Sequence, residues 1–423
     1  MNKIWCILLL ATSIACANAG NVSIITLQNP TDRNRVDEAF VIKRENMKPT
    51  NNKLVPAIKT TAGVYVPSQL DDLNKDGQWD ELAFVYTLSS REKVNLGIVW
   101  IDLAKYPKFK ARTNVRYGKM TKPGVVESLQ TDVHGRTNLP RGEGYPYQMD
   151  GPAWENDKVG FRHYFDGRNC RDVFGKRLPT MALDTVGIRP NGTPGDTYHV
   201  MSDWGRDILG VAKSFGLGGL ALQLPDTLLR LGIVQEERTD NVDSTRFTIL
   251  SKGPVRSVFT FDYYGWQVKN KKVNVHNTVT IWAGKYGCEN VVKTSALPNG
   301  ALLVTGIVTS NNGKEVREKA YNGKFISMST HDMQTYDKVW YLGMSLIMPA
   351  ENMVRTFNAP KVGPGVSNTW CASIKPNAKG EYRYNCYAAW EISDQRFRDR
   401  NFYLGMIDGY AQNMLEPVVL SIK

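Results

Sequence analysis

The chain has 423 residues, of which 42% are hydrophobic, and its 53 lysines and arginines outnumber 41 aspartates and glutamates, which gives a formal net charge of +12. This length is sufficient to bury a large core. The basic residues are spread along the chain without a helix-turn-helix, zinc-finger or RNA-binding signature, which excludes nucleic acid as the expected partner.

An export signal is predicted at the start of the chain. Lys3 supplies a positive charge, an apolar stretch follows, and the small residues Ala17 and Ala19 form a cleavage site. The alternative is a lipoprotein signal, in which Cys16 is acylated after cleavage. No stretch of the chain is long and apolar enough to span a membrane. We therefore expect a signal peptide over residues 1–19, a single domain over residues 20–423, and a periplasmic or extracellular location.

Residues 72–81, with the sequence DLNKDGQWDE, predict a calcium loop. Oxygen ligands at alternate positions converge on a hard cation, and Gly77 permits the sharp bend between them. The twelfth EF-hand position falls on Ala83, so the bidentate glutamate is missing and the loop is not an EF-hand. The alternative is an acidic turn without metal. The expected ligands of a structural Ca²⁺ are Asp72, Asn74, Asp76, the carbonyl of Gln78, and Asp80 or Glu81.

Most of the chain is predicted to form strands. Segments rich in β-branched and aromatic residues, with turn residues nearby, occur at residues 22–27, 82–86, 98–101 and 257–261. The clearest hairpin has arms at residues 257–268 and 273–282, and the second arm has one apolar face. Such long two-faced strands predict a mainly β fold, a large antiparallel β-sandwich with few short helices.

Residues 151–176 are the most informative part of the chain. They combine five aromatic residues, one histidine and three arginines in one strand-and-turn unit. Alternation places a mostly apolar set of side chains, which includes His163, opposite a polar set. His163 is therefore expected in the core. The polar set either faces bulk water or forms the wall of a cleft. Its members are Asn156, Lys158, Arg162, Tyr164 and Asp166.

A helix is predicted over residues 202–212. Ser202 or Asp203 can cap its start, and a stripe of apolar residues follows. His199 lies just before this segment. It either shares a cleft with Trp204 and Asp207, where it would act as a proton-transfer group, or has no function.

Four cysteines remain after removal of the signal, namely Cys170, Cys288, Cys371 and Cys386. An exported protein meets an oxidising setting, and Cys371 and Cys386 flank a turn-rich stretch. Two alternatives follow. These two cysteines form a bridge across a hairpin, or all four are small buried thiols.

Several separated motifs carry a family resemblance. They are residues 151–176, the stretch SDWGRDILGVAKSFGLGG, the loop DLNKDGQWDEL, and GPVR followed by YGW. Their order along the chain resembles that of the exported bacterial family called domain of unknown function 4861, over nearly the whole mature chain. The resemblance implies a galactose-mutarotase-like sandwich and a setting among genes for polysaccharide degradation, often of uronate-rich glycans. It implies no mechanism.

Three classes of function fit these features. The first is an enzyme that acts on acidic glycans, because aromatic faces stack on sugar rings and basic side chains hold uronate carboxylates. We expect β-elimination, in which Arg162 or Arg168 neutralises the carboxylate. His199 or Tyr164 would then remove the proton. The alternative reaction is hydrolysis by the paired carboxylates Glu155 and Asp207.

The second class is a non-catalytic glycan-binding protein, and the third class is a structural surface protein. The side chains expected to contact the sugar are Trp154, Arg168, Trp204 and Asp166.

Overall fold

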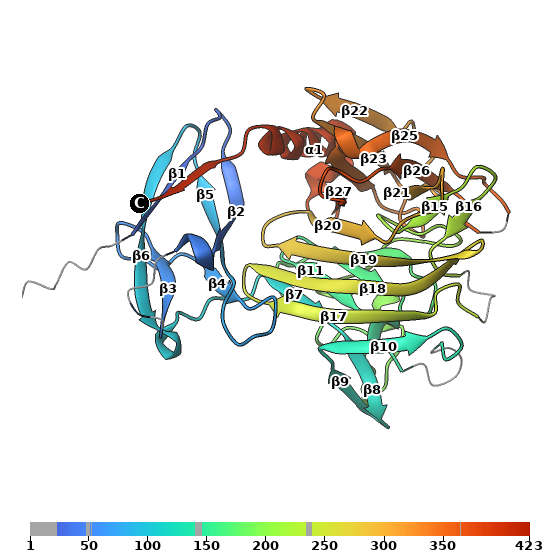
Figure 1. The fold of residues 1–423 in the computed structure, drawn as a ribbon, viewed down its shortest axis with the longest axis horizontal. Coiled ribbons are helices and arrows are strands. Elements are labelled where there is room, and N and C mark those ends of the chain that lie inside the picture. The colour runs from blue at the N-terminus through green and yellow to red at the C-terminus, as the bar shows by residue number, and fades with distance from the viewer. Residues whose placement is uncertain (1–22, 48–50, 52, 140–145, 234–238, 364) are drawn as a thin grey trace, which may run out of the picture.

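The computed structural model describes residues 23–47, 51, 53–139, 146–233, 239–363 and 365–423. Antiparallel sheets form a small sandwich, which contains the first strands, and a large sandwich, which contains most of the others (Figure 1). The prediction of a mainly β, antiparallel sandwich is therefore confirmed. The predicted export signal lies outside the described residues, and the single domain and the galactose-mutarotase-like detail stay predictions.

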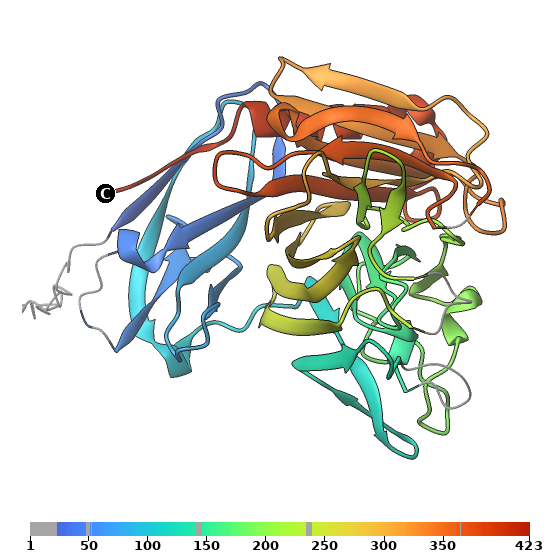
Figure 2. The same cartoon turned by 45° about the vertical axis from the view of Figure 1, so that its right-hand side comes forward.

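The small sandwich has its own apolar core. Phe40 and Phe84 stack across it with ring centroids 4.9 Å apart, and Ile25 and Leu27 are fully buried. The last strand of the chain returns from the large sandwich and pairs with the first (Figure 2). One sheet contains β28 (Val419–Ile422), β1 (Ile24–Gln28), β6 (Lys93–Asp102) and β3 (Leu54–Lys59), and the other contains β2 (Arg35–Lys43), β5 (Glu81–Leu88) and β4 (Ser68–Asp71).

The large sandwich is built on a sheet of nine strands. Its longest members form the predicted hairpin, which is confirmed, as are the predicted strands at residues 82–86, 98–101 and 257–261. In sheet order the strands are β10 (Thr131–Gly135), β17 (Ser244–Lys252), β18 (Arg256–Val268), β19 (Lys271–Trp282), β20 (Gly287–Thr294), β27 (Tyr382–Trp390), β24 (Leu342–Pro349), β23 (Phe325–Asp332) and β22 (Arg317–Tyr321).

Two five-stranded sheets share the main core with the nine-stranded sheet. Trp154 of one sheet lies 4.9 Å from Phe259 of the long sheet, measured between ring centroids. The first sheet contains β14 (Gly205–Asp207), β13 (Arg171–Lys176), β12 (Val159–His163), β11 (Ala153–Asn156) and β7 (Thr113–Arg116). The second contains β16 (Leu228–Arg230), β15 (Ala221–Gln223), β21 (Leu302–Val308), β26 (Thr369–Ile374) and β25 (Met353–Asn358). A separate pair is β8 (Gly118–Lys122) and β9 (Val125–Ser128).

The predicted helix over residues 202–212 is wrong. That segment contains β14, which pairs with β13. Gly205 has φ +136° and sits so close to Gly175 that a Cβ would meet its carbonyl oxygen. Glycines at 205 and 210 also disfavour a helix, because glycine loses more backbone entropy than other residues.

The described residues contain one α-helix, α1 (Arg400–Leu415), which the sequence analysis missed. The Asp399 side chain caps it by accepting from the Asn401 N–H at 2.8 Å. Its buried residues Tyr403, Ile407 and Ala411 recur every four positions and pack in a cluster with Ile347 of β24 and Tyr387 of β27. No helix in the described part of the chain is long and apolar enough to cross a membrane.

Short 3-10 helices link several strands, namely η1 (Arg44–Asn46), η2 (Leu103–Lys105), η3 (Gln148–Asp150), η4 (Thr197–His199), η5 (Ala350–Asn352) and η6 (Gln395–Arg398).

All four cysteines of the described chain are buried, free thiols. Cys371 lies on β26 and Cys386 on β27, which belong to different sheets. The predicted bridge across a hairpin is therefore wrong, and the alternative of buried thiols is the one observed.

Candidate functional site

The polar side of residues 151–176 is buried, so the alternative in which it faces bulk water is wrong. Arg162 of β12 and Asp172 of β13 are register partners and are 1% and 0% exposed. Residues 177–204 cover this face, and Tyr198 of that segment packs against Phe174. On the opposite face His163 is buried against Phe261 and contacts the Tyr263 hydroxyl at 3.2 Å, which confirms its place in the core.

Arg162 is the centre of a buried charge network. Its Nη2 donates to Asp172 Oδ2 and to Asp207 Oδ2, each at 2.7 Å, and its Nη1 donates to Asp150 Oδ2 at 3.1 Å. The Tyr164 hydroxyl donates to Asp172 at 3.0 Å. One guanidinium therefore faces three carboxylates, and it has no unpaired side left for the carboxylate of a substrate.

Burial sets the protonation of this network. Desolvation and the neighbouring Asp172 raise the pKa of Asp207 well above its usual value, although Arg162 opposes them. Burial also raises the pKa of the Tyr164 phenol well above its usual value. Tyr164 is therefore a poor base near neutral pH, contrary to the expected role.

His199 connects this network to solvent. Its side chain is 45% exposed, and its Nδ1 lies 3.7 Å from Asp207 Oδ2. The ring of Tyr198 lies 4.9 Å away and that of Tyr336 lies 6.3 Å away, between centroids. The structure thus brings four predicted residues together, Arg162, Tyr164, His199 and Asp207. Of these only His199 is substantially accessible.

An open cavity of about 440 Å³ lies beside the network, and two carboxylates that the sequence analysis did not single out line it. The Tyr198 hydroxyl contacts both, Asp196 Oδ1 at 3.0 Å and Asp150 Oδ2 at 3.3 Å. Desolvation raises the pKa of Asp150, with a contribution from Asp196, while Arg162 and Arg168 oppose it. Asp196 is exposed. The two carboxylates therefore contact one hydroxyl, but Asp150 is partly buried and Asp196 is exposed.

The backbone at Asp150 adopts an unusual conformation. Met149 and Asp150 have φ of 55° and 59°, in the left-handed region that residues with a side chain seldom occupy. Gly151 follows, and a Cβ there would lie 2.3 Å from the His163 carbonyl oxygen. Consecutive left-handed residues cost free energy and tend to occur at functional sites. Here they direct the Asp150 carboxylate between Arg162 and the cavity.

Two predicted residues are unavailable for their expected roles. Glu155 is 1% exposed, pairs with Lys176, and accepts from the backbone N–H groups of Ala182 and Leu183 at 2.6 and 2.8 Å. Its carboxylate is therefore saturated by structural contacts. Trp154 is fully buried between aromatic rings of the main core, so its indole has no face for a sugar.

The other predicted sugar contacts lie near the network. Arg168 pairs with Asp166 at 2.8 Å and stacks over the Tyr164 ring at 3.9 Å, with its side chain 19% exposed. Trp204 is partly buried and packs edge-on against Phe174 at 5.6 Å. Both reach the surface in part, so a role in sugar binding stays a prediction.

The loop at residues 72–80 is held by its own acidic side chains. Asp72 accepts from the Gly77 N–H at 2.9 Å, and Asp80 accepts from the Leu73 N–H at 2.7 Å. The Gln78 side chain accepts from Arg44 at 2.6 Å. Within the described chain, no group of three or more His, Cys, Asp or Glu side chains is arranged to hold a metal ion. Calcium at this loop stays a prediction.

The fold and the buried network define the chain as an antiparallel β-sandwich protein with an acidic cavity. It belongs to the family described as domain of unknown function (DUF4861), whose model matches residues 27–420, as the motifs predicted. An uncharacterized protein P7 from Formosa agariphila is 20% identical over 421 residues, which cover 95% of this chain and 93% of that protein.

Two solved structures are similar over 95% of this chain. One is an alpha-mannosidase from Enterococcus faecalis V583, with 9% identity and a TM-score of 0.48. The other is a protein in the glycosyl hydrolase family 38 from Enterococcus faecalis, with 10% identity and a TM-score of 0.45. The chain spans only 46% and 47% of the length of these two proteins.

Proposed function

We propose that this chain is an exported carbohydrate-active enzyme that cleaves uronate-containing glycans in the cavity beside Arg162. One observation carries the proposal. Asp150 and Asp196 contact the same Tyr198 hydroxyl at the wall of an open cavity, and their environments differ. A pair of carboxyl groups in unequal environments is the arrangement that acid/base chemistry on a glycosidic bond needs.

Hydrolysis is the reaction that this geometry supports best. Asp150 keeps its proton to a higher pH than an ordinary aspartate, because burial raises its pKa, and it would protonate the leaving oxygen. The exposed Asp196 would act as the nucleophile or as the base for water. Two oxygens that contact one hydroxyl at 3.0 and 3.3 Å are no farther apart than the sum of these distances. The two carboxyl groups therefore lie close enough to act together on one glycosidic bond.

β-Elimination is the second candidate, supported by the 3.7 Å contact between His199 and Asp207. A buried carboxylate behind an exposed imidazole orients it as a general base. Arg162 cannot neutralise the substrate carboxylate, since its donors are occupied. Arg189, which is exposed and lines the cavity, is the better candidate for that role.

An acidic substrate fits the charge of the chain. The net charge of +12 attracts polyanions over long distances, and arginine binds carboxylates through paired donors. A periplasmic or extracellular location is part of the proposal, because an exported protein encounters polymeric glycans in these compartments.

The test is to incubate the mature protein with acidic oligosaccharides and to follow reducing ends and the ultraviolet absorbance of unsaturated uronates. Hydrolysis gives new reducing ends without absorbance, and elimination gives both. We expect Asp196→Asn and Asp150→Asn to lower kcat at least about a hundredfold. Asp203→Asn, an exposed aspartate of the same segment with no described hydrogen bond or ion pair, is the matched control. Binding without product would instead indicate a non-catalytic glycan-binding protein.

His199→Ala separates the two reactions. It should abolish elimination and leave hydrolysis by the two aspartates largely intact. If Asp150→Asn and Asp196→Asn both retain full turnover on a cleaved substrate, the cavity is not the active site.

A further inference from the structure

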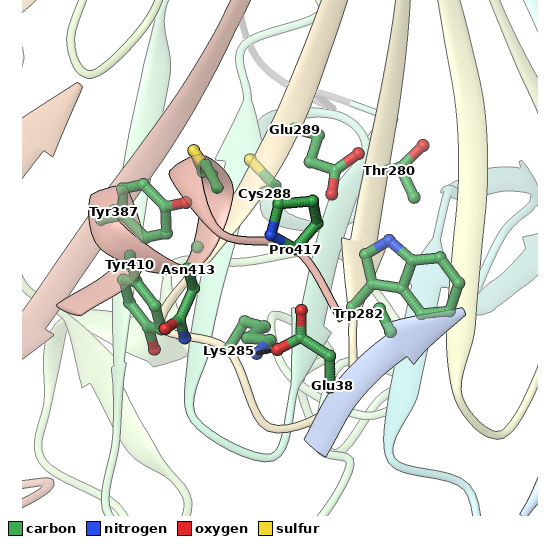
Figure 3. A pocket seen from close by; sticks show the side chains of 13 residues that line it. Glu38, Thr280, Trp282, Lys285, Cys288, Glu289, Tyr387, Tyr410, Asn413 and Pro417 are labelled. Carbon is green, nitrogen blue, oxygen red and sulfur yellow. Dashed lines mark ion pairs between the residues drawn. The ribbon is translucent and has the colours of Figure 1, made fainter. Parts of the chain in front are cut away.

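A second cavity, of about 240 Å³, lies where the small and the large sandwich meet (Figure 3). Glu38 of β2 lines it from the small sandwich, and Trp282 of β19 and Tyr387 of β27 line it from the nine-stranded sheet. Asn413 near the end of α1 and Pro417 on the way to β28 complete the wall. None of these residues belongs to the site described above.

Polar side chains without a partner line this cavity. Glu289, Thr280, Tyr387 and Asn413 make no side-chain hydrogen bond or ion pair within the described chain. Glu289 and Thr280 are register partners on β20 and β19, so both lie on the same face of the sheet. Glu289 is exposed, although desolvation by the surrounding protein raises the pKa of its carboxyl group. Glu289 is exposed and Thr280 and Asn413 are partly exposed, so these polar groups are open to a polar ligand that enters the cavity.

The aromatic and charged walls restrict the class of ligand. Tyr387 stacks on Tyr410 with centroids 4.8 Å apart, and the Lys285 ammonium lies 5.8 Å from the Tyr410 ring and 3.6 Å from Glu38. Lys285 therefore already occupies the position that a cationic ligand would take beside Tyr410. A uronate would bring its carboxylate next to Glu289, which like-charge repulsion disfavours, whereas the charge of Glu38 is already balanced by Lys285.

We propose that this cavity binds one neutral sugar ring. Each sugar hydroxyl both donates and accepts hydrogen bonds. The cavity offers matching partners, because a carboxylate accepts, an amide donates and accepts, and a hydroxyl does both. These partners are the carboxylate of Glu289, the amide of Asn413 and the hydroxyls of Thr280 and Tyr387. Trp282 and Tyr387 supply the apolar wall on which the C–H face of a pyranose packs. The volume is below the roughly 300–1,000 Å³ of sites for drug-sized ligands, so one ring fits better than an oligosaccharide. The site is independent of the proposed reaction and selects an uncharged ligand instead of an acidic one.

The experiment is calorimetric titration of the mature protein with the methyl glycosides of galactose, glucose, mannose, xylose, fucose and rhamnose. Glucuronate, galacturonate and tetramethylammonium are titrated in parallel. We expect saturable binding of at least one neutral glycoside and none of the three charged probes at this cavity.

Variants locate the binding. Glu289→Gln should raise Kd about tenfold or more, because it removes a charge-assisted acceptor, and Tyr387→Phe should raise it several-fold. Glu351→Gln, an exposed glutamate on η5, is the matched control and should leave Kd unchanged. Asp196→Asn should also leave Kd unchanged, which distinguishes this site from the proposed active site. The proposal is overturned if no neutral glycoside binds, or if a charged probe binds more tightly with an affinity that changes in Glu289→Gln and not in Asp196→Asn. It is also overturned if both cavity variants bind like the control while their melting temperatures match the wild type.

Discussion

Replacement of Arg162 by methionine tests whether the buried network is structural. Arg162 is 1% exposed, and its removal leaves Asp150, Asp172 and Asp207 without their shared cation. Breaking a buried ion pair by removal of one partner costs about 3–5 kcal/mol, because an uncompensated charge stays in a medium of low dielectric constant. We therefore expect the free energy of unfolding of Arg162→Met to fall by about this amount, measured as a lower urea midpoint by tryptophan fluorescence.

Two further variants control this experiment. Arg177→Met removes an exposed arginine of the covering segment and should change stability by about 0.5 kcal/mol or less. Adding Asp207→Asn to Arg162→Met removes one of the uncompensated carboxylates, so the double variant should regain about 1 kcal/mol or more. If Arg162→Met unfolds at the same urea concentration as Arg177→Met, the network is not structural. Arg162 would then be free for the substrate role that the sequence first suggested.

Two other predictions follow from titratable and acidic groups. If Asp150 is the general acid, activity should fall as pH rises through its raised pKa, with a midpoint above the ordinary aspartate value of about 4. A pH–rate profile that only rises with pH would instead indicate His199 as a base, since an imidazole must lose its proton to act. If the loop at residues 72–80 binds Ca²⁺ in the folded state, a chelator should lower the melting temperature of metal-loaded protein, and Asp76→Ala should remove that response. An unchanged melting curve with chelator would exclude structural calcium there.

Local patterns in the sequence predicted the strands well. The alternation of apolar residues in the 273–282 arm, and the runs of apolar, aromatic and β-branched residues at 82–86 and 98–101, act over a few positions, and the sheets preserve them. The helix prediction for residues 202–212 failed because a close approach between two parts of the chain determines the structure of this segment. Gly205 exists in a positive-φ conformation against Gly175, a contact between parts of the chain that no periodicity reveals. The helix α1 had a visible signal, since Asp399 precedes buried residues spaced by four, but Gly405 and Gly409 weakened it.

The candidate site was predicted in part because one strand carries much of it. Arg162 and Tyr164 are two positions apart on one strand and therefore share a face, and Asp172 is brought opposite Arg162 by the neighbouring strand. Whether this face is buried or exposed to solvent could not be predicted, because the segment that covers it, residues 177–204, is irregular. That cover converts a predicted substrate-binding arginine into the centre of a structural network.

Asp150 and Asp196 show why acid/base residues escape sequence analysis. Neither lies in a recognisable motif, and an aspartate in a turn is most often a capping or turn residue. Asp150 acquires its position from two consecutive left-handed residues, and its raised pKa from a cover that lies more than twenty residues further along the chain. Both effects depend on tertiary contacts. The Asp150 carboxylate also pairs with Arg162, so its replacement can lower turnover through stability as well as through chemistry. Loss of turnover in Asp150→Asn without loss of stability would therefore tie the strain at this position to chemistry.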